Sequence, residues 1–225
     1  MEVDARLKLL LRLAGEGDCL ADVGSDHGYL AAAALESGLW QRCAVTDISP
    51  FSVEKAVRNL TELGYADRCR FAQGDGFAPL QPGEAGVAVA AGMGGDVLAG
   101  ILSRGFPVER AVLQPMTGAE KLRLWLNQNG FVICEEGVAY AAGRWYVAMA
   151  VQRGQEPPLT LTEQELGRCL LADGGEDFVR WLAFKLEQVR RWQKETKGDS
   201  PQALAYRQRL ADMERRWTAE WEKRR

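Results

Sequence analysis

The sequence of 225 residues contains one histidine and lacks any apolar run of membrane-spanning length. A membrane helix needs roughly 18 or more consecutive apolar residues, and the N-terminus instead alternates charged residues with leucine. That alternation does not resemble the apolar core of a signal peptide. We therefore expect a soluble, cytoplasmic protein with no membrane partner.

Patterns that bind metals are also missing. The five cysteines are widely scattered and form no Cys-x-x-Cys pair, whereas zinc sites use closely spaced pairs of cysteine and histidine ligands. We expect no metal site. Cys19, Cys43 and Cys134 fall in predicted strands and Cys69 opens another, which predicts buried, reduced thiols.

Neither sign of charge dominates the sequence. The formal net charge is −3, with 14 basic against 19 acidic residues in 1–156 and 14 against 12 in 157–225. The overall acidity argues against a protein coated with nucleic acid, but a local basic face remains open. The length and the 47% hydrophobic content predict a globular protein with one medium domain and a smaller appendage.

The dinucleotide-binding pattern G-x-G-x-x-G does not occur at residues 20–30, where a different glycine arrangement stands. An apolar run ends in an acidic residue and Gly24, passes a polar turn to Gly28, and opens a run of alanines and leucines. This order predicts a strand, a turn and a helix, and ligands of open α/β sheets lie outside the carboxyl ends of such strands. The spacing favours a ligand without phosphate, although ordinary turn chemistry also explains the two glycines.

Two further predicted strands end in a carboxylate. Asp47 stands 23 residues after Gly24, close to the spacing at which nucleotide-binding folds place an acid on the ribose hydroxyls. Asp75, between Gly74 and Gly76, could accept from the amine of an adenine. Each acid could equally belong to an ordinary turn.

A fourth predicted strand, residues 86–90, leads into the glycine-rich residues 91–95. Glycines at this point expose backbone groups at the edge of the sheet, where a flat substrate could enter. The next strand, 111–114, is predicted to break at Pro115, and residues 117–120 have the pattern of a capping box.

The order of the elements predicts an α/β fold with a mostly parallel sheet of seven strands. The last two strands, 131–135 and 145–151, have no helix between them, which predicts an antiparallel last strand. Residues 152–162 are polar and contain prolines, so we interpret them as a linker. The predicted domains are residues 1–154 and 155–225.

Two helices, about 175–196 and about 201–223, are predicted to form a coiled-coil hairpin in the second domain. On the second helix, the predicted packing stripe is Ala203, Tyr206, Leu210, Met213 and Trp217. Basic residues on the first helix and after it form a stripe that could follow phosphates or could be a solvated face: Lys185, Arg190, Arg191, Lys194 and Lys197.

Four motifs together resemble one family. They are Ala-Asp-Val-Gly-Ser-Asp-His-Gly-Tyr-Leu from residue 21, Thr-Asp-Ile-Ser from 46, Gly-Asp-Gly from 74 and Ala-Gly-Met-Gly-Gly from 91. With Leu-Gln-Pro from 113, they closely resemble the bacterial tRNA (adenine-22-N1)-methyltransferases, which are class I S-adenosylmethionine-dependent enzymes. The resemblance implies a Rossmann-like domain followed by a helical hairpin, S-adenosylmethionine as cofactor, and methyl transfer to N1 of adenine 22 in the D arm of tRNA.

The resemblance also implies roles for individual residues. Gly24, Ser25 and Gly28 would line the methionine end of the cofactor, Asp47 would hold the ribose, and Asp75 would contact the adenine. Residues 91–94 would form the mouth through which the target base enters. The complete expected cofactor site is Gly24, Ser25, Asp26, His27, Gly28, Asp47, Ile48, Gly74, Asp75, Gly76, Ala91, Gly92 and Met93.

N1 of adenine carries a lone pair, so the reaction needs no general base, and orientation does most of the catalytic work. We expect Asp26 to accept from the N6 amine and to stabilise the charge that develops on the ring, with Tyr29 stacking on the base or hydrogen bonding to it. Asp26 could also be a plain turn residue. His27 is expected to hold the turn rather than to catalyse.

Two departures from the family pattern stand out. Leu30-Ala31 replaces an expected Leu-Pro, and Gln114-Pro115-Met116 replaces an expected Gln-Pro-Asn. The second departure could alter a polar contact to the base. Two alternatives to the tRNA enzyme remain: a methyltransferase for another substrate, and a non-catalytic adaptor that dimerises through its hairpin. If the chain is the tRNA methyltransferase, we expect a monomer.

Overall fold

The computed structural model describes residues 3–224. The chain forms two compact units, Met1–Leu159 and Thr160–Arg225, whereas the sequence predicts a boundary after residue 154. In the described range, no helix combines the length and the apolar composition needed to cross a membrane.

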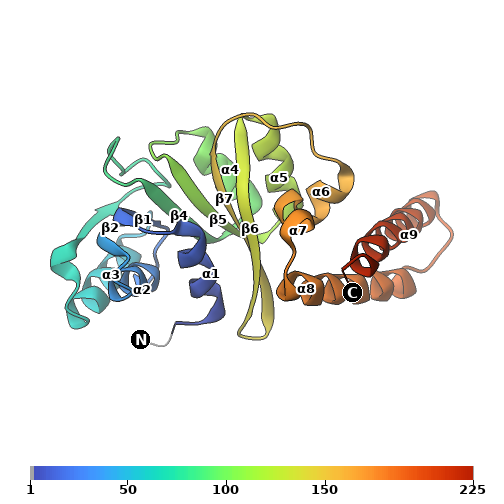
Figure 1. The fold of residues 1–225 in the computed structure, drawn as a ribbon, viewed down its shortest axis with the longest axis horizontal. Coiled ribbons are helices and arrows are strands. Elements are labelled where there is room, and N and C mark those ends of the chain that lie inside the picture. Colours follow the sequence, from blue (N-terminus) through green and yellow to red (C-terminus); the bar gives the residue numbers. More distant parts are fainter. Residues whose placement is uncertain (1–2, 225) are drawn as a thin grey trace. The chain divides into compact units, whose positions relative to one another are not determined.

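The first unit contains a sheet of seven strands in the order β3-β2-β1-β4-β5-β7-β6 (Figure 1). Its pairs are parallel except those of β7, which runs antiparallel to both β5 and β6. The predicted seven-stranded, mostly parallel sheet with an antiparallel last strand is therefore confirmed. The strands are β1 (Gly17–Val23), β2 (Trp40–Asp47), β3 (Cys69–Gln73), β4 (Val87–Gly94), β5 (Arg110–Thr117), β6 (Phe131–Ala141) and β7 (Arg144–Arg153).

Helices cover both faces of this sheet (Figure 1). The chain winds from β1 towards β3 and then, in the opposite direction, from β4 towards β5. Because both sets of crossovers are right-handed, their helices lie on opposite faces of the sheet. On one face, α1 (Ala5–Ala14), α2 (Tyr29–Glu36) and α3 (Pro50–Glu62) share a core with the strands. Leu10, Leu13 and the buried alanines of α2 lie in this core. On the other face, α4 (Gly95–Ser103) and α5 (Ala119–Gln128) pack against each other and the strands.

Strands β4 and β5 run further than the sequence predicts. Pro115 does not break β5, because it lies opposite Met93 at a bulge where the ladder of β4 is already irregular. The predicted capping box at residues 117–120 is also wrong: Gly118 is the N-cap of α5, with a left-handed φ of 71° and no side-chain cap. Because β4 continues to Gly94 and β5 to Thr117, both strands reach further towards the carboxyl edge of the sheet than predicted.

The predicted burial of the cysteine thiols is only partly correct. Cys19 and Cys43 are buried, whereas Cys134 is exposed and Cys69 is half-buried. Cys134 lies on β6 beside a register shift, at the edge of the sheet, which explains its exposure. Period-two patterns do not reveal such an irregularity.

The second unit consists of α6 (Leu161–Leu166), α7 (Arg168–Asp173), α8 (Glu176–Glu195) and α9 (Pro201–Glu222). The two long helices are confirmed as a packed pair. The predicted linker extends too far, because Thr160 and Glu163 form a capping box that starts α6. On α9 only Leu210 and Trp217 of the predicted stripe are buried, and Tyr206 is 44% exposed.

Candidate active site

The loops that follow four neighbouring strands lie side by side at one edge of the sheet. Strands β3, β2, β1 and β4 are adjacent in that order, and each of the four motifs stands at the carboxyl end of one of them. Backbone hydrogen bonds join the loops: Gly24 N donates to Thr46 O at 2.8 Å, and Gly74 N donates to Asp47 O at 2.9 Å. The predicted clustering of these motifs is therefore present in the fold.

A cavity of about 410 Å³ opens at this edge. The turn between β1 and α2 forms one wall, the first half of α1 forms another, and the end of β4 closes it. Eight of the predicted site residues line it: Gly24, Ser25, Asp26, His27, Gly28, Tyr29, Ala91 and Gly92. The structure thus brings the first and fourth motifs together around one space.

Asp22, near the end of β1, fixes the turn between β1 and α2 through hydrogen bonds. Ser25 Oγ donates to Asp22 Oδ2 at 2.6 Å, and Ser25 Oγ accepts from Gly28 N at 3.1 Å. The backbone N–H of Ala31 donates to the same Asp22 oxygen at 3.3 Å. Burial raises the pKa of Asp22 to about 6, against the opposing effect of these hydrogen bonds.

Gly24 and Gly28 are needed for different reasons. Both have a positive φ, 75° and 70°, which residues with a Cβ rarely adopt. A Cβ on Gly24 would lie 2.1 Å from Met93 Cε, so this glycine lets the end of β4 approach the turn. A Cβ on Gly28 would lie 2.9 Å from Leu60 Cδ1, so Gly28 serves the packing of α3 and not only approach by a ligand.

Asp26 is held on the rim of the cavity by α3. Its Oδ1 accepts from Lys55 Nζ at 3.0 Å and from Ser52 Oγ at 3.2 Å, and His27 Nε2 lies 3.1 Å from its Oδ2. The hydrogen bond from Lys55 contributes most to a lowered pKa of Asp26. The carboxylate is therefore ionised at neutral pH and could accept from an amine.

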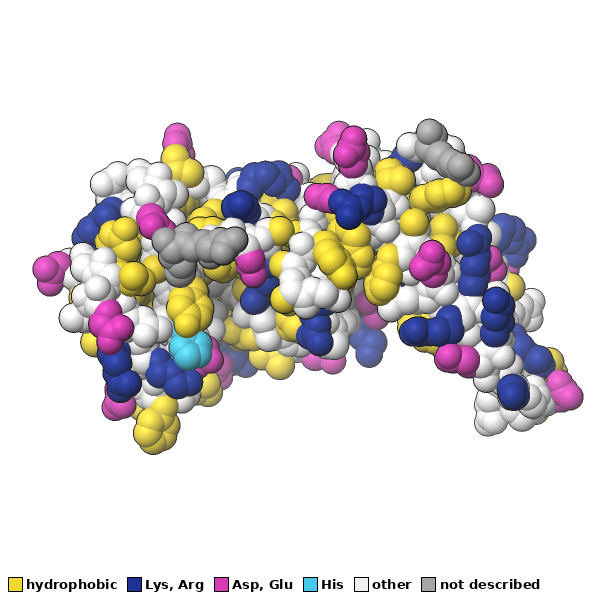
Figure 2. Space-filling view, turned by 90° about the horizontal axis from the view of Figure 1, so that it is seen from below, with side chains coloured by type: hydrophobic (Ala, Val, Ile, Leu, Met, Phe, Trp, Pro, Cys, Tyr) yellow, Lys and Arg dark blue, Asp and Glu magenta, His cyan; other side chains and the backbone are white. Residues whose placement is uncertain are grey.

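The His27 ring stacks on Tyr29, with ring centroids 5.2 Å apart and an interplanar angle of 12°. Tyr29 is 51% exposed, so the stack has a free aromatic surface at the cavity. Figure 2 shows this face, where the single histidine of the chain, in cyan, lies beside hydrophobic and basic side chains. Such a surface suits a planar base.

Sequence reasoning did not predict a cluster at the wall of the cavity that joins Arg6 to β5 and β7. Arg6 Nε donates to Gln114 Oε1 at 2.7 Å, and the Arg6 guanidinium lies 5.2 Å from the ring centroid of Tyr146. Arg6 lines the cavity, and a Cβ on Gly92 would lie 3.2 Å from its guanidinium. The helical pattern of α1 allows Arg6 to contact an anion but favours a solvated charge, and it does not predict these contacts because the partners follow far along the chain.

Asp47 and Ile48 lie beside the cavity without lining it. Asp47 Oδ1 accepts from Ser49 N at 2.8 Å, which fixes the side chain at the start of α3. Ile48 is exposed. Asp47 is close enough to Asp22 to raise its pKa, so the second motif borders the same space.

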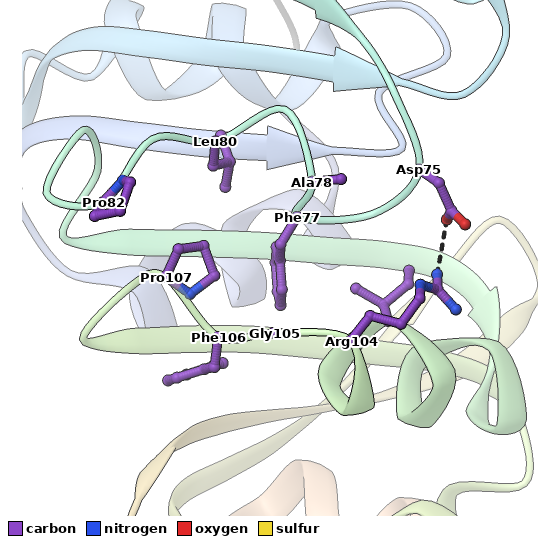
Figure 3. Close-up of a pocket in the computed structure, with 10 residues that line it drawn as sticks. Asp75, Phe77, Ala78, Leu80, Pro82, Arg104, Gly105, Phe106 and Pro107 are labelled. Atoms are coloured by element: carbon purple, nitrogen blue, oxygen red, sulfur yellow. Dashed lines mark hydrogen bonds and ion pairs between the residues drawn. The ribbon is translucent and has the colours of Figure 1, made fainter.

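Asp75 lines a second cavity, of about 510 Å³, rather than the one at the first motif (Figure 3). Its Oδ1 accepts from Arg104 at 2.8 Å, while Phe77, Leu80 and Phe106 contribute apolar walls. Because both partners of this ion pair are 54% exposed, exchanging Arg104 for an adenine amine requires little energy. Gly74 and Gly76 pack tightly, on Pro79 and Ile101 respectively.

The first cavity fits S-adenosylmethionine chemically. The cofactor carries a sulfonium, an ammonium and a carboxylate, and the lining offers the acids Asp22 and Asp26 for the cations and Arg6 for the anion. Gly24 leaves backbone exposed where the cofactor would approach. Met93, whose side chain covers Gly24, is flexible enough to move aside.

Residues 3–149 match the model of a family described as a methyltransferase domain. The match spans more than half of the chain, so the chain belongs to this family of methyltransferases.

The comparison with individual proteins is more specific. The tRNA (adenine(22)-N(1))-methyltransferase of Bacillus subtilis is 28% identical over 158 residues, which are 68% of this chain and 66% of that protein. The match thus spans about two thirds of the relative's length. A solved Streptococcus pneumoniae protein assigned as a tRNA (m1A22) methyltransferase has 27% identity and a TM-score of 0.87, covering 98% of this chain and all of its own.

That Streptococcus pneumoniae protein has also been solved in complex with S-adenosyl-L-methionine. This second structure has 28% identity and a TM-score of 0.84, and it covers 98% of this chain and 100% of its own. The resemblance to the tRNA adenine-22 N1-methyltransferases and the Rossmann-like fold are confirmed by these comparisons, and the S-adenosyl-L-methionine bound to the Streptococcus pneumoniae protein agrees with the expected cofactor.

Proposed function

We propose that this chain transfers the methyl group of S-adenosylmethionine to N1 of adenine 22 in the D arm of tRNA. The observation that carries the proposal is the cavity at the first motif, where acids, exposed backbone and an open aromatic surface surround one space. The substrate is inferred from the Bacillus subtilis and Streptococcus pneumoniae relatives. A cytoplasmic monomer is the form that we propose for the enzyme.

Bound S-adenosylmethionine supplies an electrophilic methyl group on a positively charged sulfur. In the proposed arrangement, the turn of Gly24 and Ser25 holds the methionine end, and Asp47 accepts from the ribose hydroxyls. Asp75 accepts from the adenine amine after it releases Arg104. Ile48, Gly74, Gly76 and Met93 complete the surroundings of the nucleoside.

The target adenine is proposed to enter over Ala91 and Gly92 and to stack on Tyr29. No group needs to remove a proton from N1, because its lone pair attacks the methyl group directly. Asp26 then accepts from the N6 amine, whose acidity rises as the ring becomes cationic. His27 supports the Tyr29 ring and Asp26 without exchanging a proton.

A base-paired adenine hides N1, so the enzyme must expose the nucleotide at a cost of a few kcal/mol that contacts to the RNA backbone offset. We assign these contacts to the hairpin of α8 and α9, where Figure 2 shows several basic side chains at the right. Arg190 is paired with Glu214 at 2.6 Å, and Lys194 and Lys197 are exposed. Lys194 and Lys197 are therefore the residues on which the assignment depends most.

Methyl transfer from labelled cofactor to unmodified tRNA tests the proposal, with a matched tRNA that carries guanine at position 22. We expect label only in the tRNA with adenine. Label in both RNAs would reject the position, and label in neither would favour a small-molecule or protein substrate. A molar mass of two chains, measured by light scattering, would contradict the proposed monomer.

A further inference from the structure

Helix α3 holds the turn that forms one wall of the cavity. Ser52 Oγ donates to Asp26 Oδ1 at 3.2 Å, and Lys55 Nζ donates to the same oxygen at 3.0 Å. Asn59 Nδ2 donates to His27 O at 3.0 Å. Ser52, Lys55 and Asn59 recur at steps of three and four residues, so they lie on one face of the helix. The start of α3 is therefore fixed beside the residues that are proposed to meet the target adenine.

Phe51 lies next to this face and is exposed to solvent. It directly precedes Ser52, stands about one helical turn before Lys55, and is 73% exposed, the largest fraction among the exposed large hydrophobic residues of the described chain. Single exposed hydrophobic residues are ordinary. Phe51, however, follows β2 at the edge of the sheet where the cavity opens, and the exposed Tyr29 and Ile48 stand at the same edge. The surroundings of the cavity thus carry a group of exposed apolar side chains.

A cation on the same side of α3 indicates the kind of partner. Phe51 and Arg58 are seven residues apart, nearly two helical turns, so they share one side of the helix and lie about 10 Å apart along its axis. Arg58 is exposed, and within residues 3–224 it forms no ion pair, not even with Glu54 one turn earlier. Figure 2 shows hydrophobic and basic side chains next to each other beside the single histidine. An exposed ring with a nearby cation suits RNA, because the ring can cover a base and the cation a phosphate.

We propose that Phe51 enters the base stack of the tRNA at the place that adenine 22 leaves, and so holds the adenine exposed for methyl transfer. The inference rests on the proposed function. An adenine whose amine contacts Asp26 lies next to the part of the turn that Ser52 and Lys55 hold, so the stem that it left lies over the start of α3. Arg58 then contacts a phosphate of the same stem.

The physical reason is the gap that an extruded base leaves. Its two neighbours in the stem lose a stacking partner, which adds to the free energy needed to expose the base. An apolar side chain that enters a base step replaces part of this contact, and the ring leaves water as it does so. Phe51 and Tyr29 therefore have different partners: Tyr29 stacks on the extruded adenine, and Phe51 stacks on bases that remain in the stem.

Methyl transfer to two RNAs tests this inference. The first is the tRNA with adenine 22 paired, and the second is the same tRNA with an abasic nucleotide opposite adenine 22, which makes exposure of the adenine cheap. We expect Phe51→Ala to lower kcat/KM for the paired RNA by about tenfold or more. On the second RNA, the variant should stay within about twofold of the wild type. Phe51→Trp, which keeps a large ring, should retain most of the activity on both.

Leu63→Ala is the matched control. Leu63 is the C-cap of α3, at the opposite end of the helix from Phe51, and it is 46% exposed. This change should leave kcat/KM for both RNAs as in the wild type. Because both side chains are largely exposed, both variants should fold, and calorimetric titration with S-adenosylmethionine should give the wild-type affinity in each.

Two results would overturn the inference. Unchanged activity of Phe51→Ala on the paired RNA would show that the ring does not help to expose the adenine. Equal losses on the two RNAs would show that Phe51 only supports the positions of Ser52 and Asp26.

Failure of the proposed function gives a different pattern, because the wild-type protein would then leave adenine 22 unmethylated in both RNAs. Binding of the same RNAs in the presence of S-adenosylhomocysteine, measured by fluorescence anisotropy, still decides the inference in that case. The loss of affinity in Phe51→Ala should be confined to the paired RNA. An equal loss on both RNAs, or no loss on either, would overturn the role of Phe51.

Discussion

Arg6 on α1 donates a 2.7 Å hydrogen bond to Gln114 on β5, and Gln114 is completely buried. This contact fastens the start of the first helix to the edge of the sheet that carries the cavity. The Gln114 amide donates in turn to Pro115 O at 3.0 Å, so both ends of the side chain are engaged. One buried amide thus connects the wall of the site with the Gln-Pro-Met segment.

Replacing Arg6 by alanine should destabilise the protein by about 1 to 3 kcal/mol, because it leaves a buried amide oxygen without its donor. It should also weaken binding of S-adenosylmethionine. Arg12→Ala is the control, since Arg12 lies on the same helix but pairs with Glu135 in an exposed ion pair. That change should cost no more than about 0.5 kcal/mol. Urea unfolding measures the free energy of unfolding of both variants. Equal losses of stability in the two would contradict the role of the contact between Arg6 and Gln114.

Gly24→Ala should greatly weaken cofactor binding as well as strain the backbone, because φ at Gly24 is 75° and the added Cβ would occupy space in the cavity that Gly24 lines. Gly38→Ala is the matched control: Gly38 has nearly the same φ, 73°, but no atom within 4 Å of the added Cβ. Both variants should lose about 1 to 2 kcal/mol of stability. Calorimetry with the cofactor should separate them, and unchanged binding by Gly24→Ala would refute the glycine's role at the site.

Tyr29→Ala should lower kcat/KM for tRNA by about tenfold or more, since stacking of a base on an aromatic ring contributes about 1 to 3 kcal/mol. Tyr29→Phe keeps the ring and should retain most of the activity if stacking is what matters. Tyr140→Ala, which removes another exposed tyrosine, should leave the rate unchanged. Equal losses in Tyr29→Ala and Tyr29→Phe would instead indicate that the hydroxyl is needed.

Replacing Lys194 and Lys197 together by glutamine should raise KM for tRNA and leave cofactor affinity unchanged. If both lysines contact phosphates, the slope of log affinity against log salt concentration should become shallower by about 2. Lys8 and Lys121, in the first unit, provide a control double variant with the same change in charge. An identical salt slope in the hairpin variant and the wild type would remove the hairpin from the proposed interface.

The sequence predicts the sheet well because its signals are local. Glycine or aspartate stands at the carboxyl end of β1, β2, β3 and β4, and the missing helix between β6 and β7 indicates the antiparallel strand. The cluster around Gly24 and Gly28 follows from the same logic. Local signals also explain the errors, since Pro115 lies opposite a bulge and Tyr206 lies on a part of α9 that its partner helix leaves exposed.

The rest of the site depends on tertiary contacts. Arg6 meets a residue more than a hundred positions away, so its helix alone suggests a solvated charge. Asp22 resembles any acid at the end of a strand, and only the folded structure shows that it is buried and accepts hydrogen bonds from Ser25 and Ala31. The pairing of Asp75 with Arg104 is likewise invisible before the chain is folded.

The position of the transferred methyl group tests the central claim most directly. A methyl group on N1 blocks Watson–Crick pairing, so reverse transcription of the treated tRNA should stop immediately before adenine 22, and nucleoside analysis should find 1-methyladenosine. Both signals should require wild-type protein together with S-adenosylmethionine. A stop at another nucleotide, or methylated nucleoside without any stop, would contradict the account.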